Sequence, residues 1–312
     1  MSITAVGSIA YDAVKTPFGE RERMLGGAAT HFALAASFFD TVHVVGPVGE
    51  DFGAEQLAVL ATRGTDVSDV ERVAGGKTFF WKGEYGWDLN SRETLATQLG
   101  VFERFEPKLA EPARLAEVVF LANIQPQLQR RVLELCTVAQ FVAMDSMNLW
   151  IETARAALVD VIERVECVLL NDAELRQLTG KPSLVAAARE LLEWGPSVVV
   201  AKQGEYGAAL FTAEGFFALP GYPLEVVVDP TGAGDTFAGG FVGYIARNLA
   251  RSREDATLRQ AMAYGTALAS FNVEAFGTER VRRLTFDEVQ ARVEELRRMT
   301  HFEAVAESLT WP

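Results

Sequence analysis

The chain has 312 residues, 49% of them hydrophobic, which is enough for one large α/β domain or two small ones. Acidic residues outnumber basic ones by 42 to 29, and the net charge of −13 argues against nucleic acid or an anionic membrane as the main partner. Two isolated cysteines, Cys136 and Cys167, predict no disulfide framework. The first residues do not have the pattern of a signal peptide, and no apolar run approaches the about 18 residues of a membrane span. We therefore expect a soluble, cytoplasmic protein.

Strand and helix patterns alternate in the first part of the chain. Residues 3–9 form an apolar run that predicts a buried strand, with Asp12 just after its end. A helix is predicted to open at residues 26–31, followed by a strand at 42–46 and a helix at 54–63. This alternation predicts a doubly wound, mostly parallel sheet with helices on both faces.

Residues 77–87 have a different pattern, in which aromatic residues such as Phe79, Trp81 and Tyr85 alternate with polar ones. Such alternation predicts half-exposed antiparallel strands. A ribbon of this kind inside an α/β chain is typical of a small lid or of an edge between subunits. The pattern alone fits a surface hairpin without a role equally well.

After the ribbon the alternation resumes, with strands predicted at 118–121, 141–144, 167–170, 197–201 and 207–211, and helices at 127–136 and 284–299. Polar residues are predicted at the strand ends: Asp12, Asn123, Asp145, Asn171, Lys202 and Asp229. Ligands of open α/β sheets bind at the carboxyl edge of the strands, so this edge is the candidate site. We find no repeat or linker, and we expect a single domain over residues 1–312.

The segment 226–240 carries the strongest signal. Three valines at 226–228 predict the end of a buried strand, and Gly232-Ala233-Gly234 predict a tight turn into a helix. The amide groups and dipole at the start of that helix suit a phosphate or a developing oxyanion. Asp235 would repel a bound phosphate, and it suits a general base that faces a hydroxyl and a transferring phosphoryl group. Taken alone, an aspartate at this position also suits a helix cap.

The run Asp229-Pro230-Thr231-Gly232-Ala233-Gly234-Asp235-Thr236-Phe237-Ala238-Gly239-Gly240 resembles, position for position, the signature of the PfkB carbohydrate kinases, the ribokinase-like family. The resemblance extends over about residues 3–282. It implies an ATP-dependent kinase that phosphorylates a hydroxymethyl group on a sugar or a sugar-bearing molecule. Asp235 would be the general base, and the amides of Gly232, Ala233, Gly234 and Asp235 would stabilise the γ-phosphoryl charge. The ribbon at 77–100, with a contribution from about 13–24, would close as a lid over the sugar and would also offer an edge for a homodimer.

Asn171 and Glu174 lie three residues apart at a strand-to-helix junction. On their own they suit a capping box variant, and they also suit Mg²⁺ and its waters near a nucleotide phosphate. Because Asn-x-x-Glu followed by Leu-x-x-Leu-Thr-Gly resembles the second hallmark of the family, the resemblance favours Mg²⁺ held through water.

The substrate side is predicted from the double glycine Gly26-Gly27, which resembles the first signature of the family and lets the backbone approach a sugar. Lone histidines are often structural, but His31 falls where ribokinases carry a sugar-binding asparagine. Ala10 and Ala28 replace an asparagine and a lysine of ribokinases, so the resemblance does not single out ribose as the substrate. The predicted substrate contacts are Asp12, Gly26, Gly27, His31 and Asn123.

The nucleotide side is predicted from residues 202–207 and 272–278, which resemble the phosphate-reaching segment and the loop that closes the adenine site. The implied nucleotide contacts are Asn171, Glu174, Lys202, Gly204, Thr231, Gly234 and Asn272. The resemblance also implies a K⁺ ion near Asp229 and Thr231. Two other functions stay open. One is a nucleoside kinase, whose lid aromatics would stack on a base. The other is a non-catalytic sugar or nucleotide sensor, which the presence of Asp235 and Glu174 disfavours.

Overall fold

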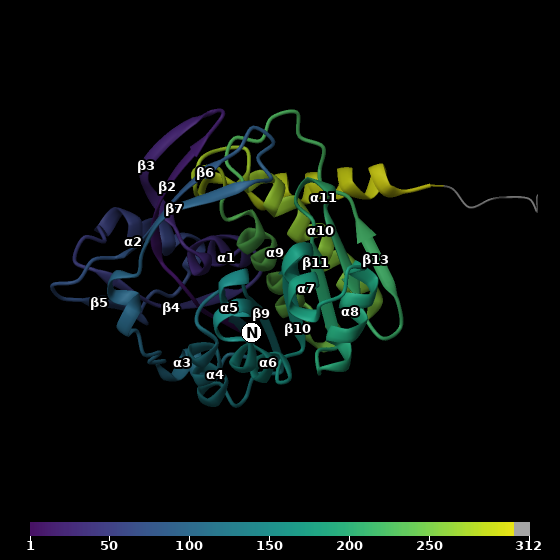
Figure 1. Cartoon of the computed structure of the whole chain (residues 1–312), viewed down its shortest axis with the longest axis horizontal. Helices are drawn as coiled ribbons and strands as arrows, with labels where there is room; N and C mark the ends of the chain where they lie inside the picture. Colours follow the sequence, from purple (N-terminus) through teal and green to yellow (C-terminus); the bar gives the residue numbers. More distant parts are fainter. Residues whose placement is uncertain (303–312) are drawn as a thin grey trace, which may run out of the picture.

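The computed structural model describes residues 1–302, which form a large nine-stranded sheet with helices on both faces and a separate four-stranded sheet (Figure 1). The strands of the large sheet are β1 (Ser2–Val6), β4 (Thr41–Gly49), β5 (Val70–Val73), β8 (Val118–Leu121), β9 (Phe141–Asp145), β10 (Cys167–Asn171), β11 (Val198–Lys202), β12 (Ala208–Phe211) and β13 (Phe216–Leu219). Their order is β13-β12-β11-β10-β9-β8-β1-β4-β5, and only β12 and β13 run antiparallel to their neighbours. The predicted doubly wound, mostly parallel sheet is confirmed. Residues 303–312 of the predicted domain lie outside the described part.

Helices cover both faces of this sheet because its strands are apolar on both sides. Val118 and Phe120 of β8 pack into one core cluster, and Val119 and Leu121 pack into the other. The first cluster lies under α1 (Ala28–Ala36), α2 (Ala54–Leu60), α9 (Ala233–Arg247) and α10 (Asp255–Asn272), with α11 (Phe286–Thr300) packed outside α10. The second lies under α3 (Glu111–Arg114), α4 (Pro126–Leu135), α5 (Asn148–Thr153), α6 (Arg155–Ile162), α7 (Asp172–Thr179) and α8 (Leu184–Glu193).

Glycines in α9 let this helix pack closely between α1 and α10. A Cβ atom on Gly239 would lie 2.3 Å from the backbone oxygen of Phe32, and one on Gly240 would lie 2.9 Å from the Cα atom of Gly265. Both distances are too short for a side chain. The position of α9 is therefore fixed by backbone contact, and so is the position of its N-terminus.

The small sheet contains β3 (Gly19–Gly26), β2 (Ala10–Thr16), β6 (Phe79–Tyr85) and β7 (Arg92–Gln98), in the order β3-β2-β6-β7. β2 pairs with β6 in parallel, and the two outer pairs are antiparallel. This sheet, which we call the lid, lies beside α1 and reaches the start of α9: Thr16 Oγ1 donates to Val228 O at 2.9 Å. The predicted small β-sheet beside the main one is confirmed.

Two expectations about strands are wrong. Residues 226–228 do not form a strand, and the side chain of Val226 is 49% exposed. No strand pairs with them through backbone hydrogen bonds, and the Val228 amide donates instead to Val273 O at the end of α10. Asp12 does not follow the first strand of the large sheet, because β1 ends at Val6 and Asp12 lies inside β2 of the lid.

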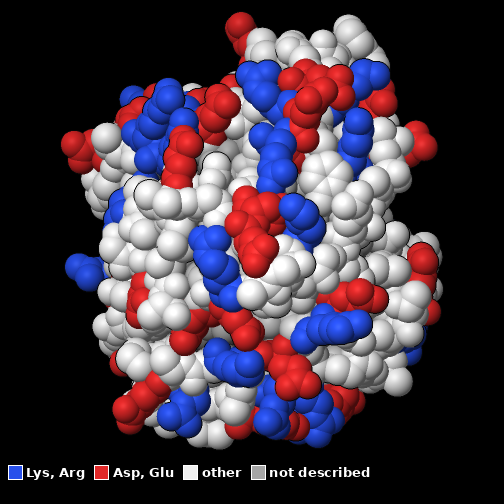
Figure 2. Space-filling view, turned by 90° about the vertical axis from the view of Figure 1, so that its left-hand side faces the viewer, with Lys and Arg blue, Asp and Glu red and all other residues white. Residues whose placement is uncertain are grey.

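The surface offers no simple electrostatic signal on the face shown in Figure 2, where acidic and basic side chains are interspersed. The net charge of −13 is therefore not gathered into one patch on that face. Cys136 and Cys167 are both buried as free thiols. Within residues 1–302, no helix is both long and apolar enough to cross a membrane.

Candidate active site

The N-terminus of α9 begins in a glycine turn, which we define as residues 229–236. Gly232 is the N-cap residue with φ 75°, a left-handed conformation that glycine adopts without strain. A Cβ atom at Gly232 would also lie 2.4 Å from the ring of His31. The N–H groups of Gly232 and Gly234 have no acceptor among the described residues, whereas Ala233 N donates to Pro230 O at 3.2 Å and the Asp235 amide interacts with its own carboxylate. Free amides at the positive end of a helix can bind an anion.

Asn272 anchors the glycine turn through hydrogen bonds. Its side chain is fully buried at the end of α10, and its Nδ2 donates to Thr231 O at 2.7 Å. Its Oδ1 accepts from Thr236 Oγ1 at 3.1 Å and lies 3.1 Å from His31 Nδ1. His31 must therefore carry its proton on Nδ1. Burial lowers the pKa of His31 to about 4, so the ring is neutral at pH 7.

Asp229 ties the same turn to the loop after α10. Its two oxygens accept hydrogen bonds from Thr231 N and Gly277 N, both at 2.9 Å. The side chain is buried, and burial raises its pKa above the ordinary value of 3.8. Asp229 therefore fixes the backbone of the turn against the loop after α10, and its predicted role in K⁺ binding stays a prediction.

A buried ion pair lies beside the turn at the carboxyl edge of the large sheet. Lys202, the last residue of β11, donates to Asp145 Oδ2 of β9 at 2.6 Å, across the intervening strand β10. The amine lies near Gly234, where a Cβ atom would be 3.2 Å from Nζ. Burial, with a smaller contribution from the charge of Asp145, raises the pKa of Asp235 to about 7, which suits a carboxylate that takes a proton near neutral pH.

Asn171 and Glu174 form the capping box at the start of α7. Asn171 Oδ1 accepts from Glu174 N at 2.7 Å, and Glu174 Oε2 accepts from Asn171 N at 2.9 Å. Burial and the charge of Asp145 raise the pKa of Glu174 to about 7. Glu174 and Asp145 therefore share the single positive charge of Lys202, and a divalent cation would balance the excess negative charge.

The double glycine Gly26-Gly27 leaves space for the side chain of Asp12. A Cβ atom at Gly26 would lie 1.9 Å from Asp12 Oδ2, and Gly27, with φ 98°, begins α1. Asp12 is 5% exposed, and burial together with the charges of Asp229 and Asp235 raises its pKa to about 7. The charges of Asp12 of the lid and Asp235 of α9 therefore act on each other across the space between the lid and the glycine turn.

The lid touches the glycine turn in this structure. Thr231 Oγ1 donates to the hydroxyl of Tyr85 at 3.2 Å, and Asn90 Nδ2 at the lid tip donates to Glu205 Oε1 at 3.0 Å. Arg92 of β7 acts on the same centre, because its charge opposes the rise in the pKa of Asp235. The lid is therefore closed over the start of α9.

Two further predicted residues, Asn123 and Gly204, contact other segments. Asn123 follows β8 and accepts from Trp150 Nε1 at 3.0 Å. Gly204 has φ 59°, and a Cβ atom there would lie 3.3 Å from Asn90 Oδ1 of the lid tip. Within residues 1–302, no group of three or more His, Cys, Asp or Glu side chains has the arrangement of a metal site.

Sequence reasoning gave no role to two residues of this centre. Asp145 was predicted at a strand end without a role. The signal that could have marked it is Lys202, which ends β11, two strands from β9 in the sheet. Tyr85 was included only as one aromatic of the ribbon, and its alternation with Trp81 was the available signal.

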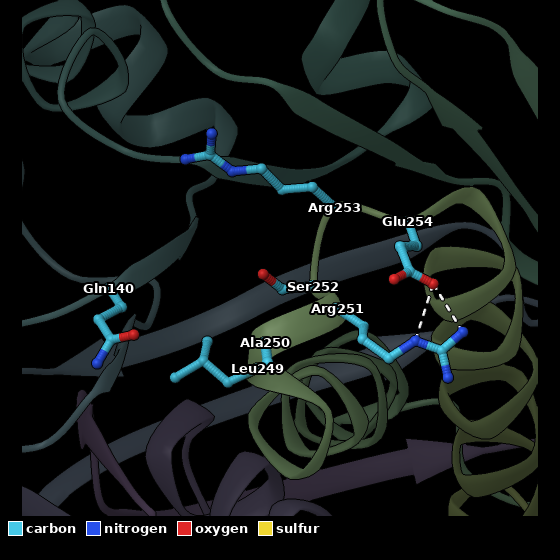
Figure 3. A pocket seen from close by; sticks show the side chains of 7 residues that line it. All are labelled: Gln140, Leu249, Ala250, Arg251, Ser252, Arg253 and Glu254. Carbon is cyan, nitrogen blue, oxygen red and sulfur yellow. Dashed lines mark hydrogen bonds and ion pairs between the residues drawn. The ribbon is translucent and has the colours of Figure 1, made fainter.

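A surface hollow of about 430 Å³ lies elsewhere (Figure 3). Gln140 on its wall immediately precedes β9, whose opposite end bears Asp145, so the hollow lies at the amino edge of the sheet. The one ion pair drawn there joins Arg251 to Glu254. The hollow takes no part in the site at the carboxyl edge.

Comparison with known proteins identifies the family. The family model described as pfkB family carbohydrate kinase matches residues 2–282, and the chain belongs to that family. It is therefore a kinase of sugars or nucleosides. A cytidine kinase from Thermococcus kodakarensis is 31% identical over 254 residues, which cover 79% of this chain and 89% of the relative.

Two solved structures share the fold. Aminoimidazole riboside kinase from Salmonella enterica, complexed with aminoimidazole riboside and an ATP analog, has a TM-score of 0.72 and 21% identity over 94% of this chain and all of its own. A ribokinase II from E. coli, in complex with ATP and Mg²⁺, has a TM-score of 0.78 and 19% identity over 94% of this chain and 99% of its own. At these identities the likeness establishes the fold alone.

Proposed function

We propose that the protein is an ATP-dependent nucleoside kinase that phosphorylates the hydroxymethyl group of a ribonucleoside. The observation that carries the proposal is that two carboxylates, the buried Asp12 and the half-buried Asp235, act electrostatically on each other beneath a closed lid and beside the free amides of α9. The similarity to a cytidine kinase over most of both chains supports a nucleoside rather than a free sugar.

Each carboxylate has a separate task. Asp12 accepts hydrogen bonds from the vicinal hydroxyls of the ribose, a geometry that suits its two oxygens. Asp235 takes the proton of the hydroxymethyl group. The oxygen of that group forms a bond to the γ-phosphorus of ATP while the bond from this phosphorus to ADP breaks. The amides of Gly232, Gly234 and Asp235 stabilise the charge on the γ-phosphoryl oxygens.

Lys202 and a bound Mg²⁺ would both interact with the phosphates of ATP. Lys202 is largely buried and lies next to Gly234, so its amine can pair with a phosphate at the amides of the turn. Glu174, with Asn171, would hold Mg²⁺ through water, because its carboxylate is in excess over the local positive charge. The metal would neutralise phosphate charge when bound.

The test is a screen of acceptors by ADP release, with the product identified by mass spectrometry. Nucleosides such as cytidine, uridine, adenosine and inosine are compared with ribose, deoxyribose and fructose. We expect at least one nucleoside to have a kcat/KM about 10² above that of any free sugar. A preference for a free sugar would contradict the nucleoside assignment, and no acceptor-dependent turnover at all would favour a sensor.

A further inference from the structure

The strand register shows which side chains of the lid face the site. β6 and β7 pair so that Arg92 lies opposite Tyr85, and residues directly opposite each other on antiparallel strands project to the same face of a sheet. Tyr85 identifies that face, because its hydroxyl reaches Thr231 of the glycine turn. Glu84, the preceding residue of β6, lies on the opposite face, where it pairs with Lys15 at 2.7 Å. Tyr85 and Arg92 therefore both belong to the face that covers the start of α9.

Thr231 forms hydrogen bonds to three other residues, and only one of them belongs to the lid. Its N–H donates to Asp229 Oδ1 at 2.9 Å, and its carbonyl accepts from Asn272 Nδ2 at 2.7 Å. Its Oγ1 donates to the hydroxyl of Tyr85 at 3.2 Å, although 146 positions separate the two residues in the sequence. The backbone of Thr231 is therefore fixed without the lid, whereas closure of the lid brings a tyrosine hydroxyl to the residue that precedes Gly232.

The hydroxyl of Tyr85 has a proton left to donate. Because it accepts from Thr231, its own O–H points elsewhere, and this hydroxyl forms no other hydrogen bond within residues 1–302. The charges of Arg92 and Asp229 both act on it, but the oxygens of Asp229 already accept from Thr231 N and Gly277 N. A half-buried donor that has no protein acceptor and lies near a cation suits an anionic oxygen of a ligand.

We propose that Tyr85 is a catalytic residue supplied by the lid, whose hydroxyl donates a hydrogen bond to an oxygen of the transferring γ-phosphoryl group. This assignment rests on the phosphoryl transfer of the proposed function and not on the identity of the acceptor. Thr231 adjoins Gly232, whose N–H has no acceptor among the described residues, so the hydroxyl of Tyr85 approaches the same anion from the side of the lid. An open lid withdraws this donor. The γ-phosphoryl group is therefore fully surrounded by donors only when the lid is closed, which limits transfer to water.

The experiment uses Tyr85→Phe, which removes only the hydroxyl, and Tyr206→Phe as a matched control, because the side chain of Tyr206 is 75% exposed. The values of kcat and KM are measured for ATP and for the acceptor that the wild type prefers. We expect Tyr85→Phe to lower kcat about tenfold or more and to leave both KM values within about threefold of wild type, because the hydrogen bond strengthens in the transition state. Tyr206→Phe should match the wild type.

A second readout measures binding without turnover. ADP with aluminium fluoride and Mg²⁺ mimics ADP together with the transferring phosphoryl group, and calorimetry in the presence of the acceptor compares its affinity with that of ADP alone. We expect Tyr85→Phe to weaken binding of the aluminium fluoride complex about tenfold and to leave the affinity for ADP unchanged, because a group that acts on the transition state binds its mimic most strongly.

A wild-type kcat in Tyr85→Phe would overturn the catalytic role and leave the proposed function standing. A raised acceptor KM with an unchanged kcat would also overturn it, because the hydroxyl would then only hold the lid closed. So would an equal loss of affinity for ADP and for its aluminium fluoride complex. A wild type that phosphorylates a free sugar and no nucleoside would contradict the proposed acceptor alone, and a wild type that phosphorylates no acceptor would overturn both.

Discussion

Replacing Asp235 with asparagine should lower turnover and raise stability, because the carboxylate at the start of α9 serves catalysis and destabilises the fold. The amide keeps the size and the hydrogen-bonding capacity of the side chain but cannot take a proton. We expect kcat to fall by at least about 10², because general-base catalysis contributes that much or more. ATP binding should persist, because the free amides and Lys202 are unchanged.

The same variant should be more stable than wild type in the absence of ligands. Raising the pKa of Asp235 from 3.8 to about 7 corresponds to an upper limit of about 4 kcal/mol against ionisation. Because Asp235 is only half-buried, solvent reduces this cost, and we expect a gain of about 1–2 kcal/mol at pH 8. The variant also loses the attraction between an acidic side chain and the helix N-terminus, which reduces the gain in stability by about 0.3–1 kcal/mol.

The dependence of this gain on pH has a definite sign. A carboxyl group with a raised pKa in the folded state binds more protons there than in the unfolded chain, so stability falls as pH rises from about 4 to about 7. The advantage of Asp235→Asn should therefore be largest above pH 7 and should vanish below about pH 4. Thermal unfolding at several pH values measures it. A variant that turns over at near wild-type rates, or one that is less stable than wild type at pH 8, would show that Asp235 is a helix cap and not the base.

Further predictions concern the neighbouring groups. Glu174→Gln can still accept the hydrogen bond of the capping box, so it should raise the Mg²⁺ concentration needed for half-maximal rate without lowering Tm; coincident Mg²⁺ titrations would leave Glu174 as a cap only. Asp12→Ala should raise the KM of the acceptor about tenfold or more and leave the KM of ATP nearly unchanged, and equal effects on both would refute the contact. The kcat/KM of the wild type should rise with pH to a plateau above about 7 as Asp235 ionises, and a flat profile between pH 5 and 8 would contradict its role. Asn272→Ala should lower both Tm and kcat because it leaves Thr231 O and His31 Nδ1 without their partner, and turnover at the wild-type rate would show that the turn holds without it.

The sequence predicted the large sheet because its signals are local. Each strand of β8, β9 and β10 is a short apolar run, and burial on both faces requires apolar residues at every position. The glycine turn was predictable for the same reason: Gly232-Ala233-Gly234 is a local signal of a tight turn, and Gly232 adopts a left-handed conformation there.

Other features depend on contacts that no short stretch encodes. The valines at 226–228 favour a strand, but a strand needs a partner strand to share its backbone hydrogen bonds, and none pairs with them. Asp12 was placed at the end of the first strand because nothing local marks the point where the chain leaves the large sheet for the lid. The pairing of Lys202 with Asp145 joins residues 57 apart across an intervening strand, and only the strand order brings them together.

The most direct test of the account is the ³¹P NMR spectrum of the product made from ATP and the preferred nucleoside. A phosphate ester on a hydroxymethyl group couples to two protons and gives a triplet, whereas an ester on a ring hydroxyl couples to one proton and gives a doublet. We predict a triplet with the wild-type protein and no product signal with Asp235→Asn in the same time. A doublet, or a triplet that forms equally fast with the variant, would contradict the assignment of Asp235 as the base that activates the hydroxymethyl group.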